Sequence, residues 1–308
     1  MLIKSRDFGT GILFFLLCLS TSLVYADLMI NPTRLVFEGR TRSGRLELLN
    51  NGTEDVTYRI SLVNRRMNED GKFSAIDTKD KDFKTEQGEH FADNMLVFSP
   101  PQVTLTPGSS QIIRIAWHRP GELADGEYRS HILFSQVPAS NSSSSIETTQ
   151  KGSDGKNITI KLTPLIGATI PIILRQGVLS VETTLTNLVF TPHKNEQEPT
   201  LGLVITRTGE RSAYGDLVVN FVPCHSQDKT TFPSCVEKFA KNRDAPGKIE
   251  LGRINGMAIY TPNALRRVTV NLKPPPTLDV SQGTLLAQFI SPIEDGAKIL
   301  SSEFLALP

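Results

Sequence analysis

The sequence predicts an all-β protein in which two β-sandwich domains follow a cleaved signal peptide. Three observations lead to this prediction. Almost no segment after the first 26 residues has the helical period of about 3.6 residues. Short runs of β-branched residues alternate with polar residues, and Gly, Pro and Asn interrupt them, which is typical of sandwich strands. Such runs fill both halves of the chain, so we expect domains over residues 27–177 and 178–308.

The N-terminus has the three regions of a secretory signal peptide. Lys4 and Arg6 form the basic region, residues 11–23 (GILFFLLCLSTSL) form the apolar region, and residues 24–26 (VYA) have the small–x–small form of a cleavage site. A membrane anchor is the alternative, but the apolar run is shorter than the stretch of about 20 residues that spans a bilayer. We therefore expect residues 1–26 to be removed on export and the mature chain to be periplasmic.

Charge and motifs argue against several classes of function. The chain carries a net charge of +1, and loss of the signal peptide leaves it neutral, without the basic surface of a nucleic-acid-binding protein. No second apolar segment is long enough to insert into a membrane. The five histidines are scattered, and no H-E-x-x-H, G-x-S-x-G or P-loop motif occurs. We expect no enzyme activity, no cofactor and no metal. An enzyme would be recognised in the structure by a deep polar pocket with convergent titratable groups.

Two cysteines remain after the signal peptide is removed. Cys224 and Cys235 enclose the short segment HSQDKTTFPS, and cysteines of an exported protein usually pair. A metal site would need more ligands than His225 adds to them. The sequence therefore predicts a Cys224–Cys235 disulfide, worth about 2–3 kcal/mol on the loop-entropy model.

Two polar segments interrupt the strands of the first half. Residues 67–94 are rich in charged side chains, and we expect a surface excursion there. Residues 139–157 (ASNSSSSIETTQKGSDGKN) are Ser-rich and without periodicity, which indicates a mobile loop.

The segment that follows, NITIKLTPLIGATIPIILR, has an apolar residue at every even position from 158 to 174. A period of two indicates a strand with one apolar face, and this one is about three times the usual length of roughly 5–6 residues. Pro164 and Gly167 are expected to divide or bend it. Its first part either completes the incomplete sheet of another protein by β-augmentation, or folds back as a long hairpin paired within its own domain.

These segments resemble the PapD-like periplasmic chaperones of chaperone–usher pilus assembly. TRLVFEG at 33–39 is similar to the first-strand T-R-x-V-F pattern of that family, and VFSPPQVTLTPGSSQIIRI at 97–115 is similar to its P-P-x-x-x-L-x-P-G segment. The Ser-rich segment before the alternating strand resembles the family's F1–G1 hairpin. The resemblance covers the order of elements in residues 27–175 and implies two immunoglobulin-like domains set at an angle.

The resemblance also implies a binding site. In the family, an arginine and a lysine in the cleft anchor the C-terminal carboxylate of a subunit, and the G1 strand completes the subunit's fold. Arg34 falls on that arginine, and a guanidinium can hold a carboxylate through two parallel hydrogen bonds. Pro171 falls on the lysine and cannot bind a carboxylate. Lys161 lies far from that position, whereas Arg129 and Arg175 are possible replacements.

The donor residues implied by the family's alternation are Leu162, Pro164 and Ile166, with Ile158 and Ile160 upstream. By strand length alone, Ile158, Ile160 and Leu162 should face the client. The later positions Ile166, Ile170, Ile172 and Leu174 should then belong to the protein's own core. Ile166 thus lies where the two assignments meet.

We therefore expect a periplasmic chaperone that caps secreted fimbrial or related subunits by donor-strand complementation and delivers them to an outer-membrane usher. The alternative is a secreted immunoglobulin-like structural or adhesive protein, such as a fibre subunit. A fibre subunit should carry an N-terminal donor extension, and only DLMI precedes the first strand of the mature chain.

Overall fold

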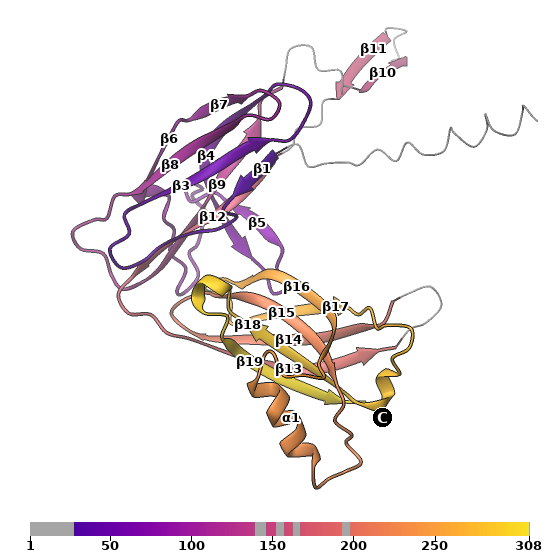
Figure 1. Ribbon diagram of the computed structural model, residues 1–308. Coiled ribbons are helices and arrows are strands. Elements are labelled where there is room, and N and C mark those ends of the chain that lie inside the picture. Colours follow the sequence, from indigo (N-terminus) through magenta and orange to yellow (C-terminus); the bar gives the residue numbers. More distant parts are fainter. Residues whose placement is uncertain (1–27, 139–145, 152–156, 163–166, 193–197, 308) are drawn as a thin grey trace, which may run out of the picture.

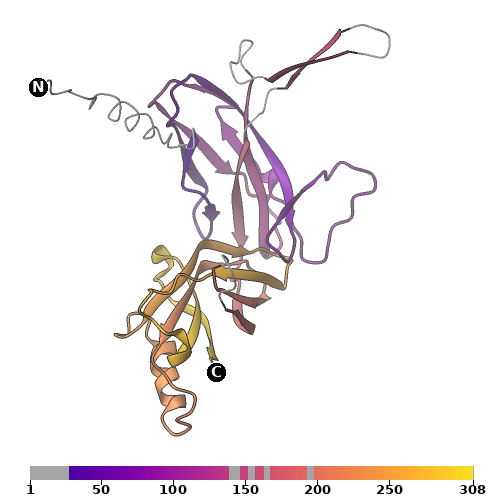
Figure 2. The ribbon, with the colours of Figure 1, turned by 90° about the vertical axis from the view of Figure 1, so that its right-hand side faces the viewer.

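The computed structural model describes residues 28–138, 146–151, 157–162, 167–192 and 198–307, and the predicted signal peptide lies outside them. Nearly all regular elements are strands, which form two domains lying end to end in both views (Figures 1 and 2). The all-β prediction is confirmed. Within these ranges no helix is long and apolar enough to cross a membrane. No group of three or more His, Cys, Asp or Glu in the same ranges could hold a metal ion.

The first domain is a sandwich of two sheets. One has the strand order β1-β3-β8-β6, and the other has the order β2-β12-β9-β4-β5 with β7 beside β4. Each strand has one face toward the interior of the sandwich. In β8, for example, Ile113, Ile115 and Trp117 are buried while the residues between them are exposed. The strands are β1 (Leu28–Asn31), β2 (Leu35–Phe37), β3 (Ser43–Asn50), β4 (Val56–Met67), β5 (Phe73–Ile76), β6 (Leu96–Ser99), β7 (Gln102–Leu105), β8 (Ser110–Trp117), β9 (Gly126–Gln136) and β12 (Gly167–Gln176), with a 3-10 turn at Asp93–Met95.

The predicted long strand is two separate strands. β12 joins the main sheet of the first domain, whereas β11 (Asn157–Leu162) pairs in antiparallel fashion with β10 (Ile146–Lys151). Figures 1 and 2 show this hairpin at the end of the first domain that is remote from the second. The prediction of a mobile loop over 139–157 was therefore wrong for residues 146–151, which form β10, whereas residues 139–145 and 152–156 lie outside the described residues. The Thr pair and Ile146 of β10 supply the β-propensity that the Ser-rich composition concealed.

The surface excursion over residues 67–94 also contains a strand that sequence analysis did not predict. β5 pairs with the end of β4 from Asn64 to Met67. Beyond β5 the segment from Asp77 to Phe91 has no helix or strand. Charge density thus correctly indicated an exposed excursion but concealed the short hairpin at its beginning.

The second domain is also a two-layer sandwich, with sheets β13-β14-β17 and β16-β15-β18-β19. Its core contains fully buried side chains from both sheets, among them Leu201, Leu217 and Phe289. The proposed boundary after Gly177 falls between β12 and β13. The strands are β13 (Val181–Thr191), β14 (Thr200–Gly209), β15 (Ala213–Val222), β16 (Ile249–Ile259), β17 (Leu265–Asn271), β18 (Thr284–Ile290) and β19 (Ile299–Ala306), with 3-10 turns at Val280–Gln282 and Ile293–Asp295.

The second domain carries a helix, α1 (Phe232–Lys241), that sequence analysis missed. Val236 and Phe239 are its buried residues and pack near the disulfide. Pro233 stands in its first turn, where the absence of an N–H costs no helical hydrogen bond. With one buried face and ten residues, the helix owes its stability to packing rather than to intrinsic propensity.

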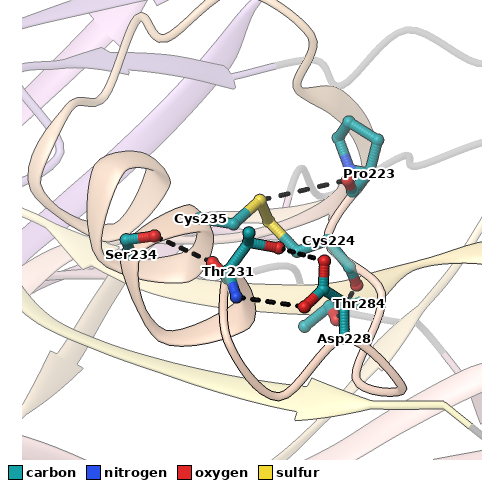
Figure 3. The surroundings of a disulfide bond; sticks show 7 residues. All are labelled: Pro223, Cys224, Asp228, Thr231, Ser234, Cys235 and Thr284. Atoms are coloured by element: carbon teal, nitrogen blue, oxygen red, sulfur yellow. Dashed lines mark hydrogen bonds between the residues drawn. A yellow bond between two sulfur atoms is a disulfide. The ribbon is translucent and has the colours of Figure 1, made fainter.

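The predicted disulfide is confirmed, and it ties this helix to the end of β15 (Figure 3). The Cα atoms of Cys224 and Cys235 lie 5.9 Å apart. Between them, the Asp228 carboxylate accepts hydrogen bonds from the N–H and the hydroxyl of Thr231. Thr284 Oγ1 on β18 donates to the Cys224 carbonyl at 2.7 Å. The loop is therefore fixed to the domain core as well as closed covalently.

The two domains contact each other through a small apolar cluster bordered by polar contacts. Met67 and Ile173 of the first domain pack with Ala258 and Tyr260 of the second. The buried carboxylate of Glu127 connects the domains at one side of the cluster. It accepts hydrogen bonds from the backbone and the hydroxyl of Ser212 in the second domain, and from Arg175 Nε at 3.1 Å.

Candidate functional site

Arg34 lies where the two domains meet. β1 pairs with β3 in one sheet and β2 pairs with β12 in the other, so the chain crosses between the sheets in the short segment that contains Arg34. The guanidinium carbon of Arg34 is 4.1 Å from the ring centre of Tyr214, which belongs to β15 of the second domain. This stacking covers one face of the guanidinium plane and leaves its N–H edge available for hydrogen bonds.

Arg34 has no counterion among the described residues. None of the ion pairs within those residues includes it, and its buried Nε has no hydrogen-bond partner. Burial lowers the pKa of Arg34, and the neighbouring hydroxyl of Tyr260 opposes that effect. A guanidinium remains charged in proteins, so the site presents a positive charge without an ion-pair partner among the described residues, although the more distant Glu127 carboxylate favours the charge.

A cavity of about 310 Å³ lies beside Arg34 and has walls from both domains. Its charged side chains are those of Arg34 and Arg266, and no Asp or Glu lines it. The remaining walls are mostly aromatic or apolar, so a bound group would be partly removed from water. The lining residues that matter below are Arg34, Phe73, His131 and Pro171 of the first domain and Tyr214, Tyr260 and Arg266 of the second.

Pro171 lines the same cavity as Arg34, although the two are far apart in sequence. It lies on β12 opposite His131 of β9. The position that the resemblance assigns to a lysine is therefore in contact with the cavity. A proline there supplies neither a charge nor an N–H donor.

The two possible replacements named from sequence are both engaged elsewhere. Arg175 forms ion pairs with Glu127 at 3.1 Å and with Glu38 at 2.9 Å, so its charge is already compensated. The guanidinium carbon of Arg129 lies 4.4 Å from the ring centre of Tyr260, and two of its N–H groups donate to backbone carbonyls. Neither side chain lines the 310 Å³ cavity. Lys161 belongs to β11, in the separate hairpin.

His131 forms part of the cavity wall in its neutral state. Burial lowers its pKa to about 3, and the nearby cations Arg129 and Arg65 add to the effect. Neither ring nitrogen has a hydrogen-bond partner among the described residues. The ring instead packs edge-on against Phe73, with centroids 5.2 Å apart. At neutral pH His131 therefore contributes shape and a possible N–H donor to the cavity, but no charge.

β12 has an open edge that leads to the cavity. On one side it pairs with β9 along its whole length, whereas on the other side β2 covers only residues 172–174. Among the described residues, 167–171 have no strand on that second side. Because β2 begins directly after Arg34, an added strand on this edge would lie in line with β2 and end at the Arg34 cavity.

The predicted donor positions divide into described and undescribed ones. Ile158, Ile160 and Leu162 lie on β11, which has β10 on one edge and no partner on the other edge among the described residues. Pro164 and Ile166 lie outside the described residues. The later positions Ile170, Ile172 and Leu174 are buried in the core of the first domain, as expected from their alternation.

Sequence analysis did not identify Arg266, Tyr214 or Tyr260 as residues of this site. All three come from the second domain, which has no recognised motif. The only sequence signal is the Arg-Arg pair in LRRVTVN, where the alternation of a strand must send the two side chains to opposite faces.

Comparison with known proteins identifies the first domain. Residues 27–163 match the family described as pili and flagellar-assembly chaperone, PapD N-terminal domain. No curated protein matches the sequence of the chain.

Similar solved structures include the CupB2 chaperone of Pseudomonas aeruginosa, with 10% identity, a TM-score of 0.41 and coverage of 91% of this chain and 100% of that one. The CsuC–CsuE chaperone–tip subunit complex of Acinetobacter baumannii has 11% identity and a TM-score of 0.39, and the match covers 91% of this chain and 97% of that one. The class 5 fimbriae chaperone CfaA has 13% identity and a TM-score of 0.39, with coverage of 91% of this chain and 99% of that one. These are similarities only. Over residues 27–163, the first domain therefore matches the N-terminal domain of pili and flagellar-assembly chaperones.

Proposed function

We propose that this protein is a periplasmic chaperone that captures an exported fimbrial or related surface subunit, completes its fold with a lent strand and delivers it to an outer-membrane usher. The observation that carries the proposal is that Arg34, at the end of the open edge of β12, has no ion-pair partner among the described residues. A subunit's C-terminal carboxylate would bind Arg34, and its last strand would pair along residues 167–171 of β12.

The geometry supports one strand direction. A subunit strand that runs along β12 from residue 167 to end at Arg34 is parallel to β12, as β2 is on the same edge. The part of the subunit that precedes this strand would then lie on the side of the first domain where the β10–β11 hairpin lies (Figure 1). Apolar side chains lent from β11 would contribute about 1.5–3 kcal/mol each when buried in the subunit. Main-chain hydrogen bonds would add about 1 kcal/mol each.

The client can be found by photocrosslinking in the periplasm. A benzophenone amino acid at position 160 should crosslink to an exported subunit, whereas the same group at the exposed position 249 in the second domain should not. The purified pair then tests the function. The chaperone should keep the subunit soluble as a small complex in gel filtration. Polymerisation of the purified protein by itself would instead indicate a fibre subunit.

Arg34→Ala is the sharpest variant for this proposal. Loss of charge-assisted hydrogen bonds to a carboxylate, worth about 3 kcal/mol, should weaken capture roughly 100-fold while the protein stays folded. Arg34→Lys should also weaken capture because the two parallel bonds are lost. Arg40→Ala, an exposed arginine of the same domain, is the matched control. Normal capture by Arg34→Ala would refute the carboxylate anchor.

A further inference from the structure

The cavity between the domains contains a second guanidinium, that of Arg266 on β17. Its Nε is buried without a hydrogen-bond partner among the described residues, and one terminal N–H donates to the Ala258 carbonyl at 2.6 Å. It has no ion pair within the same residues. The next residue behaves differently, because Arg267 is exposed and pairs with Glu69 at 3.3 Å. Of these two adjacent arginines, only Arg266 lines the cavity.

The first domain holds Arg266 in place. The turn between β4 and β5 contains Gly71, which has a φ of +79° and lies against the Arg266 guanidinium. A Cβ atom at Gly71 would lie 2.4 Å from the nearest guanidinium nitrogen. A glycine at this position therefore permits both the turn and the close approach of the arginine.

The charges around Arg34 are distributed unequally between its two sides. A neighbouring cavity of about 350 Å³ also includes Arg34, but Glu38, Glu294 and Asp295 line it together with Arg175. The 310 Å³ cavity has Arg34 and Arg266 and no acidic side chain. An anion is therefore attracted to the side of Arg34 that shares a cavity with Arg266 and repelled by the carboxylates on the other side.

We infer that Arg266 supplies the second cation of the carboxylate anchor, in place of the lysine for which this chain has Pro171. This inference rests on the proposed function, since the ligand is the C-terminal carboxylate of the bound subunit. The anchor then spans the two domains, with Arg34 from the first and Arg266 from the second. The terminal carboxylate is recognised by its charge and by hydrogen-bond donors from two directions.

The test uses two synthetic peptides of alternating valine and threonine, fluorescently labelled at the N-terminus and identical except at the C-terminus. One ends in a free carboxylate and the other in a carboxamide. Fluorescence anisotropy measures their affinity for the full mature chain. We expect the carboxylate peptide to bind at least about tenfold more tightly, because charge-assisted hydrogen bonds contribute about 1.5–3 kcal/mol. Arg266→Gln should abolish most of this preference and leave the affinity for the carboxamide peptide unchanged.

Controls separate this inference from the proposed function. Arg267→Gln changes the charge equally but lies outside the cavity, so it should keep the full preference. Arg266→Lys should restore part of it. If Arg34→Gln abolishes the preference and Arg266→Gln retains it, the role of Arg266 is refuted while the proposed anchor stands. If the unmodified protein shows no preference, both fail.

Unchanged affinity for the carboxamide peptide also shows that the Arg266→Gln variant is folded. Should that variant not fold, Gly71→Ala offers a second route, because the added methyl group displaces the guanidinium without removing it. A preserved preference in a folded Gly71→Ala variant with Arg266 displaced would likewise refute the inference.

Discussion

Changing isoleucine or leucine to threonine should have different effects in the two parts of the alternating segment, β11 and β12. Ile170 and Ile172 on β12 are 6% and 0% exposed and belong to the core of the first domain. Ile158, Ile160 and Leu162 lie on β11, whose only strand partner among the described residues is β10. Changing each of these residues to threonine retains β-propensity and removes apolar surface. We expect the β12 changes to destabilise the protein and the β11 changes to impair client binding.

The magnitude follows from burial. Isoleucine to threonine removes two buried carbon atoms, worth about 1.6 kcal/mol, and buries a hydroxyl at a further cost of about 1–3 kcal/mol when it finds no partner. The double change Ile170→Thr and Ile172→Thr should thus cost about 5–9 kcal/mol, a large part of the roughly 5–15 kcal/mol that stabilises a typical domain. The triple change on β11 should alter the free energy of unfolding by less than about 1 kcal/mol, because β11 belongs to neither sheet of the sandwich.

Trp117 provides the assay. It is the only tryptophan, and it is buried in the core of the first domain. Its fluorescence during urea denaturation therefore reports the unfolding of that domain, and the midpoint gives the change in stability. The same variants are then tested for retention of the crosslinked client. If the triple change lowers the midpoint as much as the double change does, the β11 strand serves only the protein's own fold, and strand donation is the wrong account.

Three further predictions concern the rest of the molecule. The double change Cys224→Ser and Cys235→Ser should destabilise the second domain by about 2–3 kcal/mol and leave client binding largely intact. In mass spectrometry, the unreduced protein with both cysteines should weigh two hydrogens less than its reduced form. Glu127→Ala should cost about 3–5 kcal/mol, because it leaves Arg175 and Ser212 without their buried acceptor, and should increase the radius of gyration measured by small-angle scattering. Because burial lowers the pKa of His131 to about 3, the unfolded chain binds one more proton than the folded protein between about pH 6.5 and 3. The free energy of unfolding is therefore unaffected by His131 above pH 6.5 and should decrease by about 1.4 kcal/mol for each pH unit from 6.5 down to about 3. His131→Leu should remove this dependence.

Each of these predictions has a matched control or a contradicting result. Two free thiols under oxidising conditions would contradict the disulfide. Glu38→Ala removes the exposed partner of Arg175 and should cost less than about 1 kcal/mol, so an equal effect of the two glutamate changes would argue against a special role of Glu127. His118→Asn changes an exposed histidine and should leave the acid dependence as it is. An unaltered acid slope in His131→Leu would show that another group is responsible.

Several features of the fold could be predicted because they depend on local patterns. The alternation of buried and exposed residues identified the strands of both domains, since a strand's two faces repeat every second residue. The predicted export and the cysteine spacing were enough to pair Cys224 with Cys235. Strand β10 and helix α1 were missed because their stability comes from pairing and packing that a polar composition does not display.

Local patterns in the chain were sufficient to predict the strand content, the disulfide, the resemblance of the first domain to pilus chaperones and Arg34 as a candidate anchor. They could not show which side chains surround the guanidinium of Arg34. Arg34, Pro171 and Arg266 come from distant strands and two domains, and nothing local in the chain relates them. The sequence also could not show that Arg175 is neutralised by Glu127 and Glu38 while Arg34 is not. Charge compensation depends on distances of a few ångströms between chain segments, and folding alone fixes those distances.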